Sequence, residues 1–194
     1  MGFRRSRRNY REGTRVIIKK ILSLLSKRFR ISRSPGASNT PTAGYINRNR
    51  IELALRGSSK EEIIRELVDI MARSLEPKER KRFNRDRLVA DMLDRERTMS
   101  TGLRSGIAVP HAKTDGVREL YVAIGIKKEG VDFEALDGEP STIFVAIASP
   151  KKKAEPHIRV LSDLSGLLKD PVLRSRLLSV ENSAEAEALL RSAL

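Results

Sequence analysis

Two apolar runs decide the fold class: residues 120–126 read LYVAIGI and residues 143–148 read IFVAIA. Each run has the length of a strand and no alternation of polar residues, which is typical of strands covered on both faces. A third, very short run, Ile107-Ala108-Val109, stops at Pro110. These runs predict a small buried β-sheet.

Helical patterns surround these runs. Ser58 and Ser59 each stand three residues before a glutamate, and such capping boxes predict the start of a helix. Further along, Asp170-Pro171 places a capping side chain before a proline, another helix start. Helices are expected over residues 58–75, 84–97, 155–168, 171–178 and from 183 onward. Helices on both faces of a few buried strands give an α/β fold with a small mixed β-sheet.

The positive charge is concentrated at the N-terminal end. The chain of 194 residues has a net charge of +14, of which +11 lies in residues 1–44 and only +3 in residues 45–194. Residues 35–44, PGASNTPTAG, have the composition of a flexible linker. The sequence therefore predicts a basic N-terminal extension (1–34), a linker (35–44) and one folded domain (45–194).

Within the extension, residues 15–31 read RVIIKKILSLLSKRFRI, which places apolar residues on one helical face and basic residues opposite. Such a segment binds anionic membranes or a partner protein. The alternative is a disordered basic extension whose pattern is accidental, because short helices are marginal in isolation. Charge alone would give only non-specific nucleic-acid binding. We expect a cytoplasmic protein, peripheral to the membrane if this segment binds lipid.

Residue counts exclude several chemistries. The chain has no cysteine and only two histidines, His111 and His157. Disulfides, thiolate metal sites and a cysteine nucleophile are therefore excluded, and a zinc site lacks enough ligands. We expect neither a metal nor a cofactor. A serine triad is poorly supported because no nucleophile elbow is present.

The informative stretch is residues 100–112, STGLRSGIAVPHA. His111 follows a proline at the expected exit of a buried strand, after a polar loop whose glycines allow close approach of an anion. A lone histidine is more often structural, but His157 falls in the first turn of an expected helix, where the macrodipole favours a bound anion. Histidine as a phosphoryl acceptor remains, because a neutral imidazole nitrogen is a good nucleophile.

Residues 93–113, LDRERTMSTGLRSGIAVPHAK, resemble the active-site signature of the enzyme IIA domains of the bacterial phosphotransferase system, fructose–mannitol type, a family that includes the nitrogen-regulatory IIA proteins. Two later motifs match the family in the same order, Asp137-Gly138-Glu139-Pro140 and His157-Ile158-Arg159-Val160-Leu161. The resemblance covers residues 45–194 and leaves the basic extension outside it.

The resemblance implies that His111 accepts a phosphoryl group from the phosphocarrier HPr or a paralogue, and passes it to an EIIB domain. It implies that Arg95 neutralises phosphoryl charge and that His157 assists as a neighbouring donor. Ser100, Thr101 and Gly102 would contact the phosphoryl group, although turn formation explains the two hydroxyls equally well. The alternative is a regulatory module that uses the phosphorylation state of His111 as a switch toward a target protein.

Overall fold

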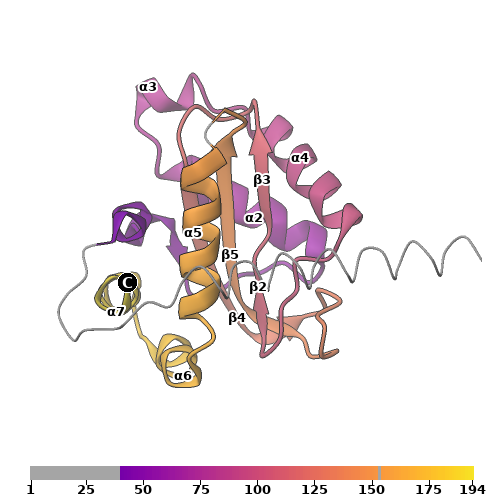
Figure 1. The fold of residues 1–194 in the computed structure, drawn as a ribbon, viewed down its shortest axis with the longest axis vertical. Helices are drawn as coiled ribbons and strands as arrows, with labels where there is room; N and C mark the ends of the chain where they lie inside the picture. The colour runs from indigo at the N-terminus through magenta and orange to yellow at the C-terminus, as the bar shows by residue number, and fades with distance from the viewer. Residues whose placement is uncertain (1–39, 153) are drawn as a thin grey trace, which may run out of the picture. The chain divides into compact units, whose positions relative to one another are not determined.

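A five-stranded mixed sheet lies at the centre of the domain (Figure 1). The structure is a computed structural model and describes residues 40–152 and 154–194, so the expected amphipathic segment 15–31 lies outside the described residues. The expected strands are present, and two are longer than the apolar runs that predicted them. The strands are β1 (Ile51–Glu52), β2 (Ile107–Ala108), β3 (His111–Thr114), β4 (Tyr121–Val131) and β5 (Ser141–Pro150).

Strand β5 pairs on both sides and organises the sheet. It runs antiparallel to β4 and parallel to both β2 and β3, while β1 pairs parallel with β4. His111 follows the exit of the short strand β2, as expected, but it also begins a further strand, β3, that was not predicted, and there it pairs with Ile147. Pro110 interrupts the edge only briefly, because its carbonyl still accepts a hydrogen bond from the Ile147 N–H at 3.0 Å.

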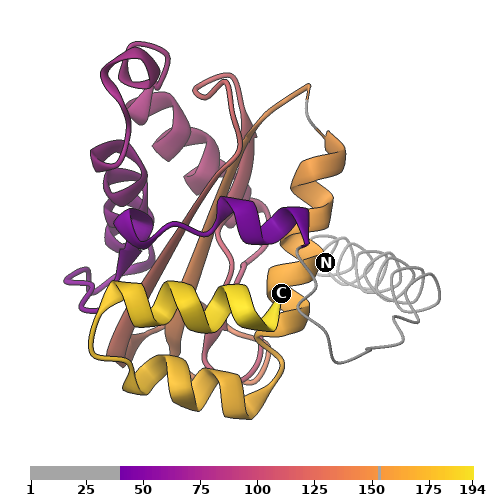
Figure 2. The same ribbon diagram turned by 90° about the vertical axis from the view of Figure 1, so that its left-hand side faces the viewer.

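Helices cover both faces of the sheet, which confirms the predicted layers. One face packs against α2 and α4, and the other against α5, α6 and α7. Figure 2 shows α6 and α7 side by side on the α5 side of the sheet. The short helix α3 and the strand β1 were not predicted, because elements of two to four residues show no periodicity. The helices are α2 (Lys60–Arg73), α3 (Pro77–Arg80), α4 (Arg85–Thr98), α5 (Ala154–Leu167), α6 (Pro171–Ser179) and α7 (Ser183–Ala193).

Side-chain caps explain where these helices begin. Ser59 accepts the Glu62 N–H at the start of α2, and Asp170 accepts the Val172 N–H at the start of α6. Such caps satisfy N–H groups that have no partner within the helix. The two starts predicted from capping residues are therefore confirmed.

The domain begins earlier in the chain than residue 45. Pro41–Tyr45 forms a 3₁₀ helix, η1, and a second one, η2, covers Arg48–Arg50. Thr42 and Ala43 in η1 are buried, and the Thr42 hydroxyl donates to Asp163 of α5 at 2.5 Å. The last residues of the expected linker 35–44 thus belong to the folded domain, because they pack against α5.

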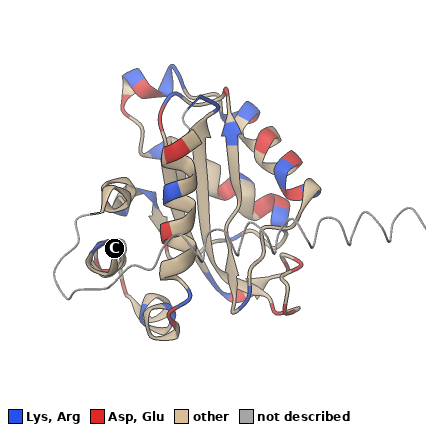
Figure 3. Cartoon of the chain, in the orientation of Figure 1, with Lys and Arg blue, Asp and Glu red and all other residues tan. Residues whose placement is uncertain are grey.

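The surface of the domain carries both signs of charge. Figure 3 shows basic and acidic residues interspersed along α4. Two ion pairs form between oppositely charged residues of this helix, Arg87 with Asp91 at 3.0 Å and Arg97 with Asp94 at 2.6 Å. This mixture agrees with the small net charge of residues 45–194 in the sequence.

Candidate functional site

The fold brings the two histidines together. His111 begins β3 and His157 lies in the first turn of α5, on either side of the end of β5. Their ring centroids are 5.6 Å apart and the ring planes are inclined at 55°. The start of α5 therefore lies beside His111.

The hydrogen bond of His111 fixes the position of its proton. Its Nδ1 lies 2.8 Å from the carbonyl oxygen of Val109. Since a carbonyl can only accept, Nδ1 carries the proton and Nε2 keeps its lone pair. Burial lowers the pKa of His111, the Val109 bond opposes this, and the charge of Arg95 lowers the pKa further. The half-buried ring is thus mainly neutral near pH 7, with a nucleophilic Nε2.

His157 is more deeply enclosed, with only 4% of its surface exposed. Its Nδ1 lies 2.7 Å from the hydroxyl oxygen of Ser149, the penultimate residue of β5. Burial lowers the pKa of His157 to about 4, and the nearby His111 and Lys113 act in the same direction. This imidazole is therefore uncharged at neutral pH.

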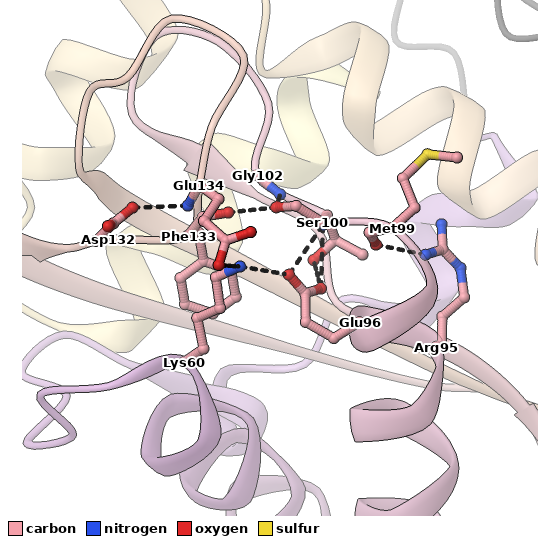
Figure 4. A network of polar contacts seen from close by, with 10 residues as sticks. Lys60, Arg95, Glu96, Met99, Ser100, Gly102, Asp132, Phe133 and Glu134 are labelled. Atoms are coloured by element: carbon pink, nitrogen blue, oxygen red, sulfur yellow. Dashed lines mark hydrogen bonds and ion pairs between the residues drawn. The ribbon is translucent and has the colours of Figure 1, made fainter. Parts of the chain in front are cut away.

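Arg95 supplies positive charge from the last turn of α4. Its Nη1 donates to the Met99 carbonyl at 2.8 Å, as Figure 4 shows. Burial lowers the pKa of Arg95, but a guanidinium stays charged at neutral pH. Among residues 40–152 and 154–194 no carboxylate forms an ion pair with Arg95. Its positive charge lowers the pKa of both imidazoles.

The next residue, Glu96, holds the loop that follows α4. Its carboxylate, which is buried, accepts the Thr101 N–H at 3.0 Å and the Thr101 hydroxyl at 2.5 Å. The Lys60 ammonium lies 3.3 Å from the same carboxylate and 3.2 Å from that of Glu134. Figure 4 shows Arg95 and Glu96 pointing in different directions from α4. Glu96 anchors the loop, whereas the charge of Arg95 acts on the pKa of both histidines.

Ser100 and Gly102 attach the same loop to the chain that follows β4. The Ser100 hydroxyl donates to the Phe133 carbonyl and accepts the Gly102 N–H at 3.0 Å (Figure 4). A Cβ on Gly102 would lie 2.6 Å from that carbonyl oxygen, so no larger residue fits without a shift. The hydroxyls of Ser100 and Thr101 thus stabilise the turn in this structure, and their contact with a phosphoryl group stays a prediction.

A chain of hydrogen bonds connects this loop to His111. The Thr101 carbonyl accepts the Val109 N–H at 3.0 Å, and the Val109 carbonyl accepts from His111 Nδ1. The glycine-rich turn between them is held by Asp137, whose carboxylate accepts the Ser105 N–H at 2.7 Å. The orientation of the His111 ring therefore depends on the loop that Glu96 anchors.

Sequence reasoning missed Glu96 and Ser149 as parts of this site. Glu96 stands within the signature but looked like one more charge of a solvated helix. Ser149 ends the apolar run of β5, and a polar residue there was the available signal. Two basic residues outside this site, Arg104 and Lys151, are exposed, and Lys151 pairs with the exposed Asp115 at 2.6 Å.

The described residues contain no group of three or more histidines, aspartates or glutamates placed to hold a metal ion. The two imidazoles consequently have no third protein ligand near them in this part of the chain. The arrangement of a neutral nucleophile, a second imidazole and an arginine is instead suited to an anionic group transferred to nitrogen.

Comparison with known proteins agrees with this geometry. Residues 44–193 match the family model described as phosphoenolpyruvate-dependent sugar phosphotransferase system, EIIA 2. The fructose-specific EIIABC component of Bacillus subtilis is 34% identical over 137 residues, which are 71% of this chain and 21% of that protein. The chain thus spans about a fifth of that longer relative.

Two solved structures share the fold. The nitrogen regulatory protein IIA-Ntr from Neisseria meningitidis superposes with a TM-score of 0.68 at 27% identity, covering 78% of this chain and 99% of that one. The mannitol enzyme IIA of Escherichia coli, solved in complex with phosphorylated enzyme IIB, gives 0.61 at 27% identity, covering 73% and 94%.

The matched region includes every residue of the site described above. The chain belongs to the EIIA type 2 family of the phosphotransferase system, the phosphotransfer components with carrier and regulatory roles.

Proposed function

We propose that His111 accepts a phosphoryl group from HPr or a paralogue and holds it as a phosphohistidine. The observation that carries this proposal is the hydrogen bond from His111 Nδ1 to the Val109 carbonyl, which leaves the lone pair on Nε2. The membership of the chain in the EIIA type 2 family supports the same role.

The transfer needs no change in the number of protons on the protein. The lone pair of His111 Nε2 forms the new bond to phosphorus, while the bond from phosphorus to the donor's imidazole nitrogen breaks and its electrons return to that nitrogen. The His111 ring becomes cationic and keeps its proton on Nδ1. The Val109 carbonyl then stabilises this cation through a charge-assisted hydrogen bond.

Arg95 and His157 would stabilise the transferred group. In phosphoryl transfer most of the catalysis comes from positioning and from charge facing the equatorial oxygens. Arg95 offers a planar set of donors, and His157 offers a neutral donor that does not repel the positive Arg95. Ser100, Thr101 and Gly102 would contribute mainly by holding the loop between Arg95 and His111.

Incubation with enzyme I, HPr and labelled phosphoenolpyruvate tests this proposal. We expect label on the wild-type protein at His111, none on His111→Ala, and slower labelling of His157→Ala, which retains the acceptor. Mass spectrometry then locates the phosphate. Full labelling of His111→Ala, or an unlabelled wild type, would refute the proposal.

The onward step has two candidates. Transfer to an EIIB domain is favoured by the fold shared with the mannitol enzyme IIA that is solved with phosphorylated enzyme IIB. A regulatory switch is favoured by the fold shared with IIA-Ntr, since a phosphoryl group makes the face around His111 more negative. Movement of label to an added EIIB domain supports the first, and a target protein whose affinity changes on phosphorylation supports the second.

We propose membrane attachment only for the basic segment 15–31. No helix in the described ranges 40–152 and 154–194 is both long and apolar enough to cross a membrane. Sedimentation with anionic liposomes should therefore compare the full chain with a deletion of residues 1–39, which leaves the packed η1 intact. Equal binding by both proteins would exclude the segment as an anchor.

A further inference from the structure

The row of β5 side chains that faces α5 ends in an unexpected residue. Ile143, Val145 and Ile147 belong to the core shared with α5, and the next residue in the row is Ser149. Its side chain is completely buried. A hydroxyl at this position needs a hydrogen-bond partner, because an unsatisfied buried hydroxyl is costly. The partner is Nδ1 of His157, at 2.7 Å.

This contact can be made in two ways. Either Nδ1 carries a proton and donates to the hydroxyl oxygen, or the hydroxyl donates to an unprotonated Nδ1. In the first case the hydroxyl proton of Ser149 would need another acceptor, and the described residues offer none. That would leave a buried donor unsatisfied, which is unfavourable. The second arrangement satisfies both groups.

We propose that Ser149 is a positioning residue that donates to His157 Nδ1 and so holds the single ring proton on Nε2. A neutral imidazole has one proton, and when Nδ1 accepts, that proton must lie on the other nitrogen. His157 then offers an N–H donor on the side of its ring opposite Ser149. The Ser149 hydroxyl thus makes His157 a hydrogen-bond donor at Nε2. In the same way, the Val109 carbonyl makes His111 a nucleophile at Nε2.

The inference rests on the proposed role of His111, because it specifies how the second imidazole serves the transferred phosphoryl group. If the proton of His157 lay on Nδ1 instead, its Nε2 lone pair would be the free side of the ring and would repel phosphoryl oxygens. The opposite tautomers of two neighbouring rings, 5.6 Å apart, supply an acceptor for phosphorus and a donor for its oxygens.

The test combines tautomer measurement with transfer kinetics on the full chain. Nitrogen-15 NMR of the wild type should show His157 with a protonated Nε2 and a bare Nδ1. In Ser149→Ala we expect a shift toward the Nδ1–H form and about tenfold slower phosphorylation of His111, equivalent to about 1.4 kcal/mol. Ser149→Thr, which keeps a hydroxyl, should restore both readouts.

Ser141→Ala is a matched control. Ser141 is also fully buried and stands at the other end of the same row of β5, but its hydroxyl has no hydrogen-bond partner among the described residues. Its removal should change neither the tautomer nor the rate. A wild-type His157 protonated on Nδ1 would overturn the inference, as would a Ser149→Ala protein with the tautomer or rate of wild type. An unlabelled wild type would instead refute the proposed function and leave the tautomer result standing.

Discussion

The two sides of the site are held in position by different chemistry. On the Arg95 side, α4 ends in a charged network in which Glu96 receives two bonds from Thr101 and lies beside Lys60. On the His157 side, a buried imidazole meets the neutral hydroxyl of Ser149. The difference follows from the group that each side provides. The Arg95 side provides a guanidinium that is always charged, and the His157 side provides an uncharged imidazole.

A positive donor, Arg95, and a neutral donor, His157, are stabilised in different ways within one small site. Burial lowers the pKa of Arg95, and the charge of Glu96, which pairs with Lys60 and not with Arg95, opposes that shift. His157 needs the opposite condition, since burial and the positive charges of Lys113 and Arg95 both favour its neutral form. Removal of Glu96 should therefore lower the free energy of unfolding itself, whereas removal of His157 should change how that free energy depends on pH.

The largest effect is expected from Glu96→Ala. The change leaves the buried N–H and hydroxyl of Thr101 without their acceptor, so we expect a loss of about 4 kcal/mol in the free energy of unfolding. Urea denaturation measures it. Glu134→Ala is the control, because it removes the other, exposed carboxylate beside Lys60 and should change little. Equal losses in both variants would show that Glu96 does not anchor the loop.

The second-largest effect is expected in the pH dependence of stability, through His157. The pKa of His157 is about 4 in the folded protein and about 6.5 when unfolded, so the unfolded chain binds more protons between these values. The stabilisation is complete above pH 6.5 and is lost as the pH falls toward 4, by about 3 kcal/mol. His157→Gln should remove this part of the pH dependence. Parallel stability curves of variant and wild type would contradict the prediction.

The smallest effect is expected from Arg95→Lys. Arg95→Lys keeps the positive charge but replaces a planar set of donors with a point charge, so we expect about tenfold slower phosphorylation of His111, equivalent to about 1.4 kcal/mol. Arg97→Lys is the control, as Arg97 is exposed on the same helix and pairs with Asp94. A wild-type rate for Arg95→Lys would remove Arg95 from the phosphoryl-binding group.

Much of the fold was predictable because local signals were strong. The runs at 120–126 and 143–148 indicated the two long strands, and Ser59 and Asp170 marked helix starts that the structure confirms. The strand β3 was missed because Pro110 looked like an end. Only its pairing with β5 shows that the edge continues from His111.

The sequence by itself determined the α/β layers, the family and the three residues assigned to phosphoryl transfer, because periodicity, capping and a motif are local properties of the chain. Only the tertiary structure decided which ring nitrogen each histidine exposes, since this depends on partners, Val109 and Ser149, that the sheet brings into contact. The same holds for Glu96, whose buried carboxylate is distinguished from a solvated one only by the loop folded over it.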